Sequence, residues 1–340
     1  MAHFVYHGPG KDISMSSDLF GDRYDRPLNR IEGTQFFYYS TRLEPDARLP
    51  YGYTRDFDEF LGDPSNPKKV EGGKVALVSM PDWKEPAFLQ VQAAESRGRV
   101  EDVTLVSKQF GEPLGIKVYL PNGYDSSRSY PVVYVLSGTD AIKEGRMVEA
   151  LDNLIGKRVE PLIAVFVPDP GERPGGRFSG RKSYLELAGE DKDKTRLMLV
   201  EELLPLIESR YRIERKAERR ALMGPDDAAY ASLYATLRHP DLFTGLGLLS
   251  LSWEPGYRAQ NTALLKTPSE QPLRIYLEWG KYDSRSPREG WDAVDNGRVF
   301  AATLRSKGYA FNGGETHEGA GWIARRNRLD RLLETLFPAH

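Results

Sequence analysis

The chain has 340 residues, of which 40% are hydrophobic and 28% are charged, and its formal net charge is -2. This ordinary globular balance can bury a sizeable core, and the length fits one large α/β domain plus a smaller one. The sequence has no long basic run, which argues against a nucleic-acid partner. No apolar run approaches the length of a transmembrane helix, so a membrane span is excluded.

The N-terminal segment, MAHFVYHGPGKDISMSSD, lacks the basic region and apolar core of a signal peptide. We therefore expect a cytoplasmic protein, or a periplasmic or secreted one if a leader has been removed. The absence of cysteine rules out disulfides, a cysteine nucleophile and thiolate metal sites. No H-E-x-x-H motif and no clustered His/Asp set is present, so we expect no metal and no other cofactor.

Residues 1 to about 30 are polar and rich in Gly and Asp, and we predict an irregular lead-in there. From residue 34 to about 94 the patterns predict short strands, TQFFYYSTRL, KVALVSM and AFLQVQA, separated by clusters such as GDPSNPKKVEGG. No helical periodicity interrupts them. Residues 1–95 are therefore predicted to form a small β-sandwich.

From residue 96 to 340, short apolar runs alternate with helical patterns. The apolar runs are VTLVSKQF, GIKVYLP, VVYVL, LIAVFV, RRALM, TGLGLLS and RIYLEW. The helical patterns are MVEALDNLI, TRLMLVEELLPLIESRY, DAAYASLYATL, VFAATLRSKG and WIARRNRLDRLLETLF. This alternation predicts an α/β domain with a doubly wound, mostly parallel sheet covered on both faces. In such a sheet the site lies beyond the carboxyl ends of the strands.

The segment ALMGPDDAAYASLYATLRHPDLF, residues 221–243, runs from a buried strand through a sharp turn into a helix. This is the geometry of a nucleophile elbow, whose usual signature is G-x-S-x-G. Gly224 holds the first position and Ala228 the last, while Asp226 stands where the serine would be.

Together with this elbow, the phrases VYLPNGYD, YPVVYVLSG, LDNLI, EELLPLIESRYR, RRALMG, YASLYATLRHPDLF and RIYLEWGKYD resemble the enterochelin esterase and esterase D-like branch of the α/β-hydrolases. The resemblance covers roughly residues 100–338 and implies an α/β-hydrolase domain. The strand-rich segment with GDPSNP resembles the immunoglobulin-like domain that precedes the hydrolase domain in enterochelin esterases.

The resemblance also implies site positions. His317 falls where the family's histidine precedes its C-terminal helix, and Asp283 falls where an acid would orient it. Glu278, Asp292 and Asp295 compete with Asp283 for that role. The oxyanion donors would be the backbone N–H groups of Asp227 and of Gly138 or Thr139, although the family's His-Gly pair is Ser137-Gly138 here. Direct attack of Asp226 on an ester would form an anhydride, so ordinary esterase chemistry is the reaction that this substitution damages most.

Three uses of Asp226 remain open on chemical grounds. It can attack a saturated carbon to form an alkyl ester that His317 hydrolyses, or position a water or hydroxyl together with His317. It can also be an inactivated position in a binding protein. An engineered substitution is a fourth explanation. In the plainest alternative, Asp226 or Asp227 only caps the following helix.

Several side chains indicate a substrate class. The rings of four tryptophans are predicted near the pocket and suit sugars or aromatic groups: Trp253, Trp279, Trp291 and Trp322. The alternative for each is core packing. The loop over 168–190 carries Arg173, Arg177 and Arg181, which can bind an anionic substrate group or form a solvated surface.

The sequence thus predicts a hydrolase that acts through Asp226 as nucleophile or general base, with His317 and Asp283. Its partner would be a small-molecule substrate of saccharide or siderophore type, and a homo-oligomer is compatible with the sequence. The alternative is a catalytically inactive binding protein on the hydrolase fold.

Overall fold

The structure is a computed structural model that describes all residues except 22–25, 71–72, 170–171, 174–176, 179–192, 253–254, 287–290 and 340. Two compact units are distinguished by their internal contacts. The first, the N-terminal unit, combines Met1–Glu85 with Trp279–Asp295 and Glu315–Ala324. The second, the α/β unit, comprises Pro86–Glu278, Asn296–Gly314 and Arg325–His340.

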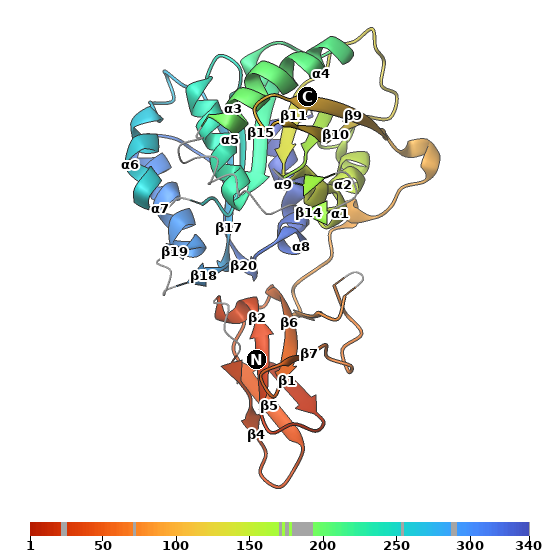
Figure 1. Cartoon of the computed structure of the whole chain (residues 1–340), viewed down its shortest axis with the longest axis vertical. Coiled ribbons are helices and arrows are strands. Elements are labelled where there is room, and N and C mark those ends of the chain that lie inside the picture. Colours follow the sequence, from red (N-terminus) through yellow and green to blue (C-terminus); the bar gives the residue numbers. More distant parts are fainter. Residues whose placement is uncertain are drawn as a thin grey trace. The chain divides into compact units, whose positions relative to one another are not determined.

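Residues 1–85 of the N-terminal unit form short, mostly antiparallel strands, drawn in red and orange in Figure 1. One sheet has the order β1 (Ala2–His7), β5 (Phe36–Thr41), β4 (Asn29–Arg30). In the other, β2 (Ile13–Ser17) lies between β3 (Arg26–Pro27) and β6 (Arg48–Arg55), and β6 also pairs with β7 (Glu59–Leu61) and β8 (Ala76–Ser79). Aromatic rings fill the core of this unit, among them Phe4, Tyr6, Phe37, Tyr51 and Tyr53. The expected small β domain is present.

Two local predictions in this part of the chain are wrong. The segment 1–30 is not an irregular lead-in, because AHFVYH alternates buried and exposed side chains and forms β1, and ISMSS forms β2. The segment AFLQVQA is not a strand: Ala87–Leu89 form a single 3₁₀ turn, η2, which begins directly after Pro86. The alternating pattern of β1 is typical of a strand, but the polar residues that follow it favoured the prediction of an irregular segment.

The α/β unit contains the predicted doubly wound sheet. Its strand order is β17 (Arg274–Tyr282), β16 (Gly245–Leu249), β15 (Arg220–Pro225), β11 (Val132–Leu136), β12 (Ile163–Val167), β10 (Glu112–Leu120), β9 (Arg99–Ser107). Strands β11, β12, β15, β16 and β17 are parallel, and β9 and β10 are antiparallel. Every residue of β11, β12, β15 and β16 is buried, so helices cover both faces of the central strands.

Helices lie along this part of the chain, and the α-helices among them carry their labels in Figure 1. They are α1 (Gly138–Lys143), α2 (Met147–Leu154), α3 (Lys194–Leu197), the π-helical η5 (Met198–Leu203), α4 (Leu204–Arg210), α5 (Asp226–Arg238), α6 (Pro255–Leu264), α7 (Ala293–Ser306), α8 (Trp322–Arg325) and α9 (Leu329–Leu336). The last strand, β20 (Asn312–Gly319), precedes α8. None of the helices among the described residues is long and apolar enough to cross a membrane.

Candidate active site

The elbow forms where the sequence predicted it. Strand β15 ends at Pro225 and α5 begins at Asp226, whose φ of +47° lies in the left-handed region. A non-glycine residue there is strained, and such strain is typical of a residue held at a functional turn. A Cβ on Gly224 would lie 2.7 Å from the Cβ of Ala228, so the turn requires the small residues at both ends of the motif.

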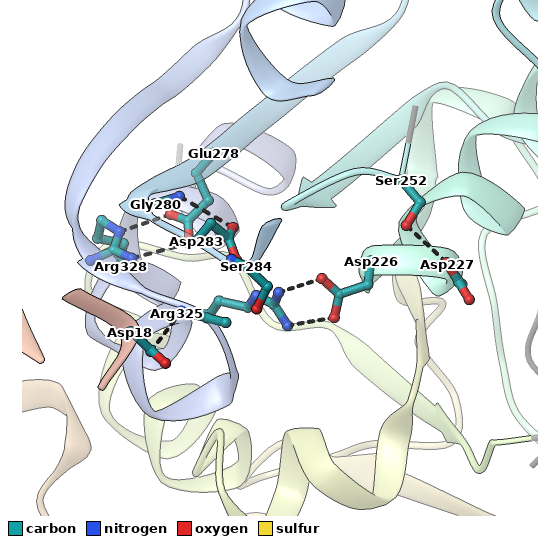
Figure 2. Close-up of polar contacts among 11 residues, drawn as sticks. Asp18, Asp226, Asp227, Ser252, Glu278, Gly280, Asp283, Ser284, Arg325 and Arg328 are labelled. Carbon is teal, nitrogen blue, oxygen red and sulfur yellow. Dashed lines mark hydrogen bonds and ion pairs between the residues drawn. The ribbon is translucent and has the colours of Figure 1, made fainter. Parts of the chain in front are cut away.

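The Asp226 carboxylate pairs with Arg325. Arg325 Nη1 donates to Oδ2 at 3.1 Å and Nη2 donates to Oδ1 at 2.6 Å, as Figure 2 shows. The Arg325 side chain is 4% exposed and that of Asp226 is 54% exposed. A guanidinium fork on both oxygens of one carboxylate is a strong, directional arrangement. The buried cation therefore fixes the orientation of the residue at the nucleophile position.

Asp227 and Ser252 form a second contact at the elbow. Ser252 Oγ donates to Asp227 Oδ1 at 2.8 Å, and Ser252 N donates to the carbonyl of Asp226 at 3.3 Å. The side chain of Asp227 thus binds a neighbouring loop, while its N–H lies in the first turn of α5, where no acceptor within the helix exists. The negative charges of Asp226 and Asp227 lie at the N-terminus of α5, where they stabilise the helix through its dipole.

The predicted oxyanion position lies at the start of α1. Gly138 and Thr139 are in the first turn, directly after Ser137, which is left-handed with a φ of +54°. A Cβ on Gly138 would lie 2.5 Å from the backbone nitrogen of Val167, so only glycine fits this close approach. First-turn N–H groups are the kind of donor that an oxyanion needs.

His317 pairs with an acid that the sequence did not suggest. Its side chain lies within β20, is 39% exposed, and its Nδ1 is 2.6 Å from Asp46 Oδ1. Asp46 lies in the turn before β6, and nothing in the sequence connects it with residue 317. The residues between β20 and α8 are Ala320 and Gly321. Neither carries a titratable side chain.

Asp283 does not orient His317 in this structure. Its carboxylate is 1% exposed and accepts hydrogen bonds from the N–H groups of Ser284, at 2.9 Å, and Gly280, at 3.4 Å. These bonds close the turn that follows β17. Asp283 stabilises its own loop, and the acid beside His317 is Asp46.

Glu278, a competing candidate acid, belongs to a buried ion pair. Arg328 donates to it from Nε at 2.9 Å and from Nη2 at 3.2 Å, and the Tyr276 hydroxyl donates at 2.6 Å. Burial and the adjacent Glu278 raise the pKa of Tyr276 well above its usual value, so this hydroxyl remains a donor. The pair links β17 with the segment before α9.

The tryptophans are only partly described. Trp279 and Trp322 are 6% and 3% exposed, so these two rings pack in the interior and do not form an open aromatic wall. The Nε1 of Trp279 donates to Glu315 at 3.0 Å. Trp253 and the side chain of Trp291 lie outside the described residues.

The loop over 168–190 is described only in part. The backbone of Arg173 and Arg177 is described in the short strands β13 (Glu172–Arg173) and β14 (Arg177–Phe178), but their side chains are not, and Arg181 lies outside the described residues. Among the residues with described positions, no group of three or more His, Cys, Asp or Glu side chains is placed to hold a metal ion.

The family model described as "Putative esterase" matches residues 107–325. A curated relative, the endo-1,4-beta-xylanase/feruloyl esterase of Xylanibacter ruminicola, is 25% identical over 265 residues, which are 75% of this chain and 33% of the relative. The chain therefore spans about one third of that relative's length.

Among solved structures, the ferric enterobactin esterase of Salmonella typhimurium has a TM-score of 0.76 at 18% identity, covering 98% of this chain and 92% of its own. A ferulic acid esterase of Anaeromyces mucronatus has a TM-score of 0.56 at 21% identity, covering 73% and 94%. These likenesses show the α/β-hydrolase fold. With the family match over residues 107–325, they establish that the chain belongs to the family described as "Putative esterase".

Proposed function

We propose that this chain is a binding member of the esterase family that does not hydrolyse esters by the serine mechanism. The observation that supports the proposal is the pairing of Asp226 with Arg325 through both carboxylate oxygens. To attack carbon or accept a proton, the carboxylate must use an oxygen lone pair. Both of its oxygens already accept a charge-assisted hydrogen bond from Arg325. A group held in this way is better suited to an inactive position than to a nucleophile.

The other positions of a hydrolase site support the same proposal. In α/β-hydrolases the order along the chain is nucleophile, acid, histidine. After β17 the acid is Asp283, which is bound to its own turn, and the loop after β20 consists of Ala320 and Gly321. His317 lies three residues before Ala320, inside the strand, and is bound to Asp46.

The ligand would be a small molecule of saccharide or siderophore type. Similar solved structures carry the names ferric enterobactin esterase and ferulic acid esterase. Both names refer to esters of small organic molecules. A scaffold that loses its chemistry can keep the pocket that recognised such a ligand.

A hydrolase acting through Asp226, His317 and Asp283 is the competing proposal. Three observations favour it, of which two concern Asp226: its backbone strain, and the 54% exposure of its carboxylate despite the ion pair. The pair of His317 and Asp46 also keeps a histidine beside an acid. In this version the Arg325 pair would orient the attacking oxygen.

Hydrolysis of p-nitrophenyl acetate and of an epoxide, styrene oxide, by the wild type, Asp226→Asn and Asp226→Ser distinguishes these proposals. We expect the wild type to be no faster than Asp226→Asn. Turnover by the wild type that disappears in Asp226→Asn would instead establish a working carboxylate and overturn the binding proposal. Asp241→Asn, which changes an exposed aspartate beyond the C-terminal end of α5, is the matched control.

The Asp226→Ser variant measures how far the site has departed from a serine hydrolase. We expect it to stay inactive, because the loop after β20 offers no base. Ester turnover by this variant would mean that a base is still in reach, and that serine alone was lost. Circular dichroism spectra and melting curves of each variant exclude unfolding as the cause of inactivity.

A further inference from the structure

The N-terminal unit contains a cavity of about 490 Å³. Its lining comes from β2 and the residues after it, from β6, from Phe60 in β7 and Val75, and from the end of β17 and the turn after it, all within this unit. Six lining residues are used below: Ser16, Asp18, Tyr51, Phe60, Tyr282 and Ser284. The volume lies within the range of small-molecule sites, about 300–1,000 Å³.

Two of these residues have side-chain hydroxyl groups with no hydrogen bond to any described residue. Within the described part of the chain, neither the Ser16 nor the Ser284 side chain has a hydrogen-bond partner, and both residues are half-buried. A free hydroxyl can both donate and accept. The two serines come from distant segments of the chain and line one cavity.

The Asp18 carboxylate is fixed against the loop that follows β20. Its Oδ2 accepts a hydrogen bond from the N–H of Ala320 at 3.0 Å. A Cβ on Gly319 would lie 2.0 Å from the same oxygen, so only glycine allows this approach. The carboxylate is therefore held in place before any ligand arrives, which reduces the ordering cost of binding.

Aromatic rings supply the apolar part of the lining. The Tyr51 hydroxyl donates to Asp63 at 2.6 Å and the Tyr282 hydroxyl donates to Glu44, so both hydroxyls are bound elsewhere in the unit. Tyr51 is 6% exposed and packs in the core of the unit, so Tyr282 offers more ring surface to a ligand. Phe60 adds a further ring and is 40% exposed.

We propose that this cavity binds a neutral polyhydroxylated ligand, a mono- or disaccharide. The hydroxyls of Ser16 and Ser284 and the carboxylate of Asp18 match the alternating donors and acceptors of sugar hydroxyls, and the rings match the apolar faces of a pyranose. Among the described lining residues Asp18 carries a negative charge, and the guanidinium of Arg285 lies beside the lining residue Gly21, so these two charges oppose each other. A sugar acid or a phosphate therefore fits the cavity less well than a neutral sugar.

The test is isothermal titration of the full chain with cellobiose, maltose and xylobiose, with glucuronate and choline as charged probes. We expect at least one disaccharide to bind, glucuronate to bind more weakly than that disaccharide, and choline not to bind. Ser16→Ala and Ser284→Ala should each weaken binding by about tenfold, which corresponds to one lost hydrogen bond. Both substitutions remove only a half-buried oxygen and should leave the fold intact.

Phe60→Ala and Phe57→Ala form a matched pair of variants. Phe57 is 83% exposed and does not line the cavity, so its removal should leave affinity unchanged, while removal of Phe60 should weaken it. The proposal is overturned if none of the disaccharides binds, or if binding is insensitive to both serine variants. Choline binding that is lost in Asp18→Asn would also overturn it, because the ligand would then be a cation.

This proposal is independent of the chemistry at the elbow. Asp226→Asn should bind the disaccharide as the wild type does. Ester turnover by a protein that binds the disaccharide would overturn only the proposed function. An inactive protein that binds no disaccharide would overturn only the sugar site.

Discussion

Arg325, at the end of α8, binds both carboxylate oxygens of Asp226, at 3.1 and 2.6 Å, across 99 positions of the sequence. Only 4% of the Arg325 side chain is exposed. A cation in that position needs a partner, and the residue that provides it stands where a serine hydrolase has its nucleophile. The acid that stands in place of the serine at the elbow and the buried arginine opposite it therefore form one structural unit.

The first prediction concerns the strength of this pair. Asp226→Asn and Arg325→Gln should each destabilise the fold, and the double variant should cost less than the sum, with a coupling energy of about 1–3 kcal/mol. Urea unfolding of the four proteins measures it. The control cycle combines Asp226→Asn with Arg331→Gln, an exposed arginine of α9, and should be additive. Additive effects in the Arg325 cycle would show that the pair contributes nothing.

The second prediction concerns the elbow turn. Gly224→Ala should destabilise the protein by about 1–3 kcal/mol, because the new Cβ would overlap Ala228 at the start of α5. Gly115→Ala in β10 is the matched control, since nothing lies within 4 Å of the Cβ that it adds. Thermal melts of the two variants provide the comparison. Equal melting temperatures would mean that the turn relaxes without cost.

The sequence predicted the elements whose signals are local. Gly224 and Ala228 identified the elbow, and runs such as VVYVL and LIAVFV identified the buried parallel strands, because burial on both faces requires uninterrupted apolar residues. Membership of the esterase family agrees with that prediction.

The hydrogen-bond partners of the site side chains could not be predicted from local sequence signals. Asp226 was found from its neighbours, but Arg325 appeared only as one cation in the helical pattern WIARRNRL, and no local rule connects two residues in different elements. For the same reason, Asp46 was not recognised as the partner of His317. Asp283 was correctly placed in the turn after β17, yet its carboxylate faces the backbone N–H groups of that turn.

The third prediction concerns pH. Burial raises the pKa of Glu44, but hydrogen bonds from Lys281 and Tyr282 outweigh this effect and lower it from 4.5 to about 2. Because the folded pKa lies below the unfolded one, the stabilisation is complete above 4.5 and is lost as the pH falls toward 2.

Glu44→Gln should therefore flatten the decline in the free energy of unfolding over this acidic range. Urea titrations at several pH values, with the exposed Glu32→Gln as control, measure the slope. If Glu44→Gln and the control lose stability in parallel with the wild type, the contact does not operate in solution.

The last prediction concerns the buried pair of Glu278 and Arg328. Their side chains are 2% and 14% exposed, and Tyr276 donates a third hydrogen bond to the carboxylate. Glu278→Gln preserves the volume but removes the negative charge that faces the largely buried guanidinium of Arg328, so it should cost about 3–5 kcal/mol. Asp102→Asn in the exposed pair with Lys117, whose side chains are 84% and 48% exposed, should cost at most about 1 kcal/mol. Urea unfolding of both variants gives the comparison. A Glu278→Gln variant no less stable than Asp102→Asn would mean that water reaches Arg328, and that the pair does not link β17 to the segment before α9 as a buried contact.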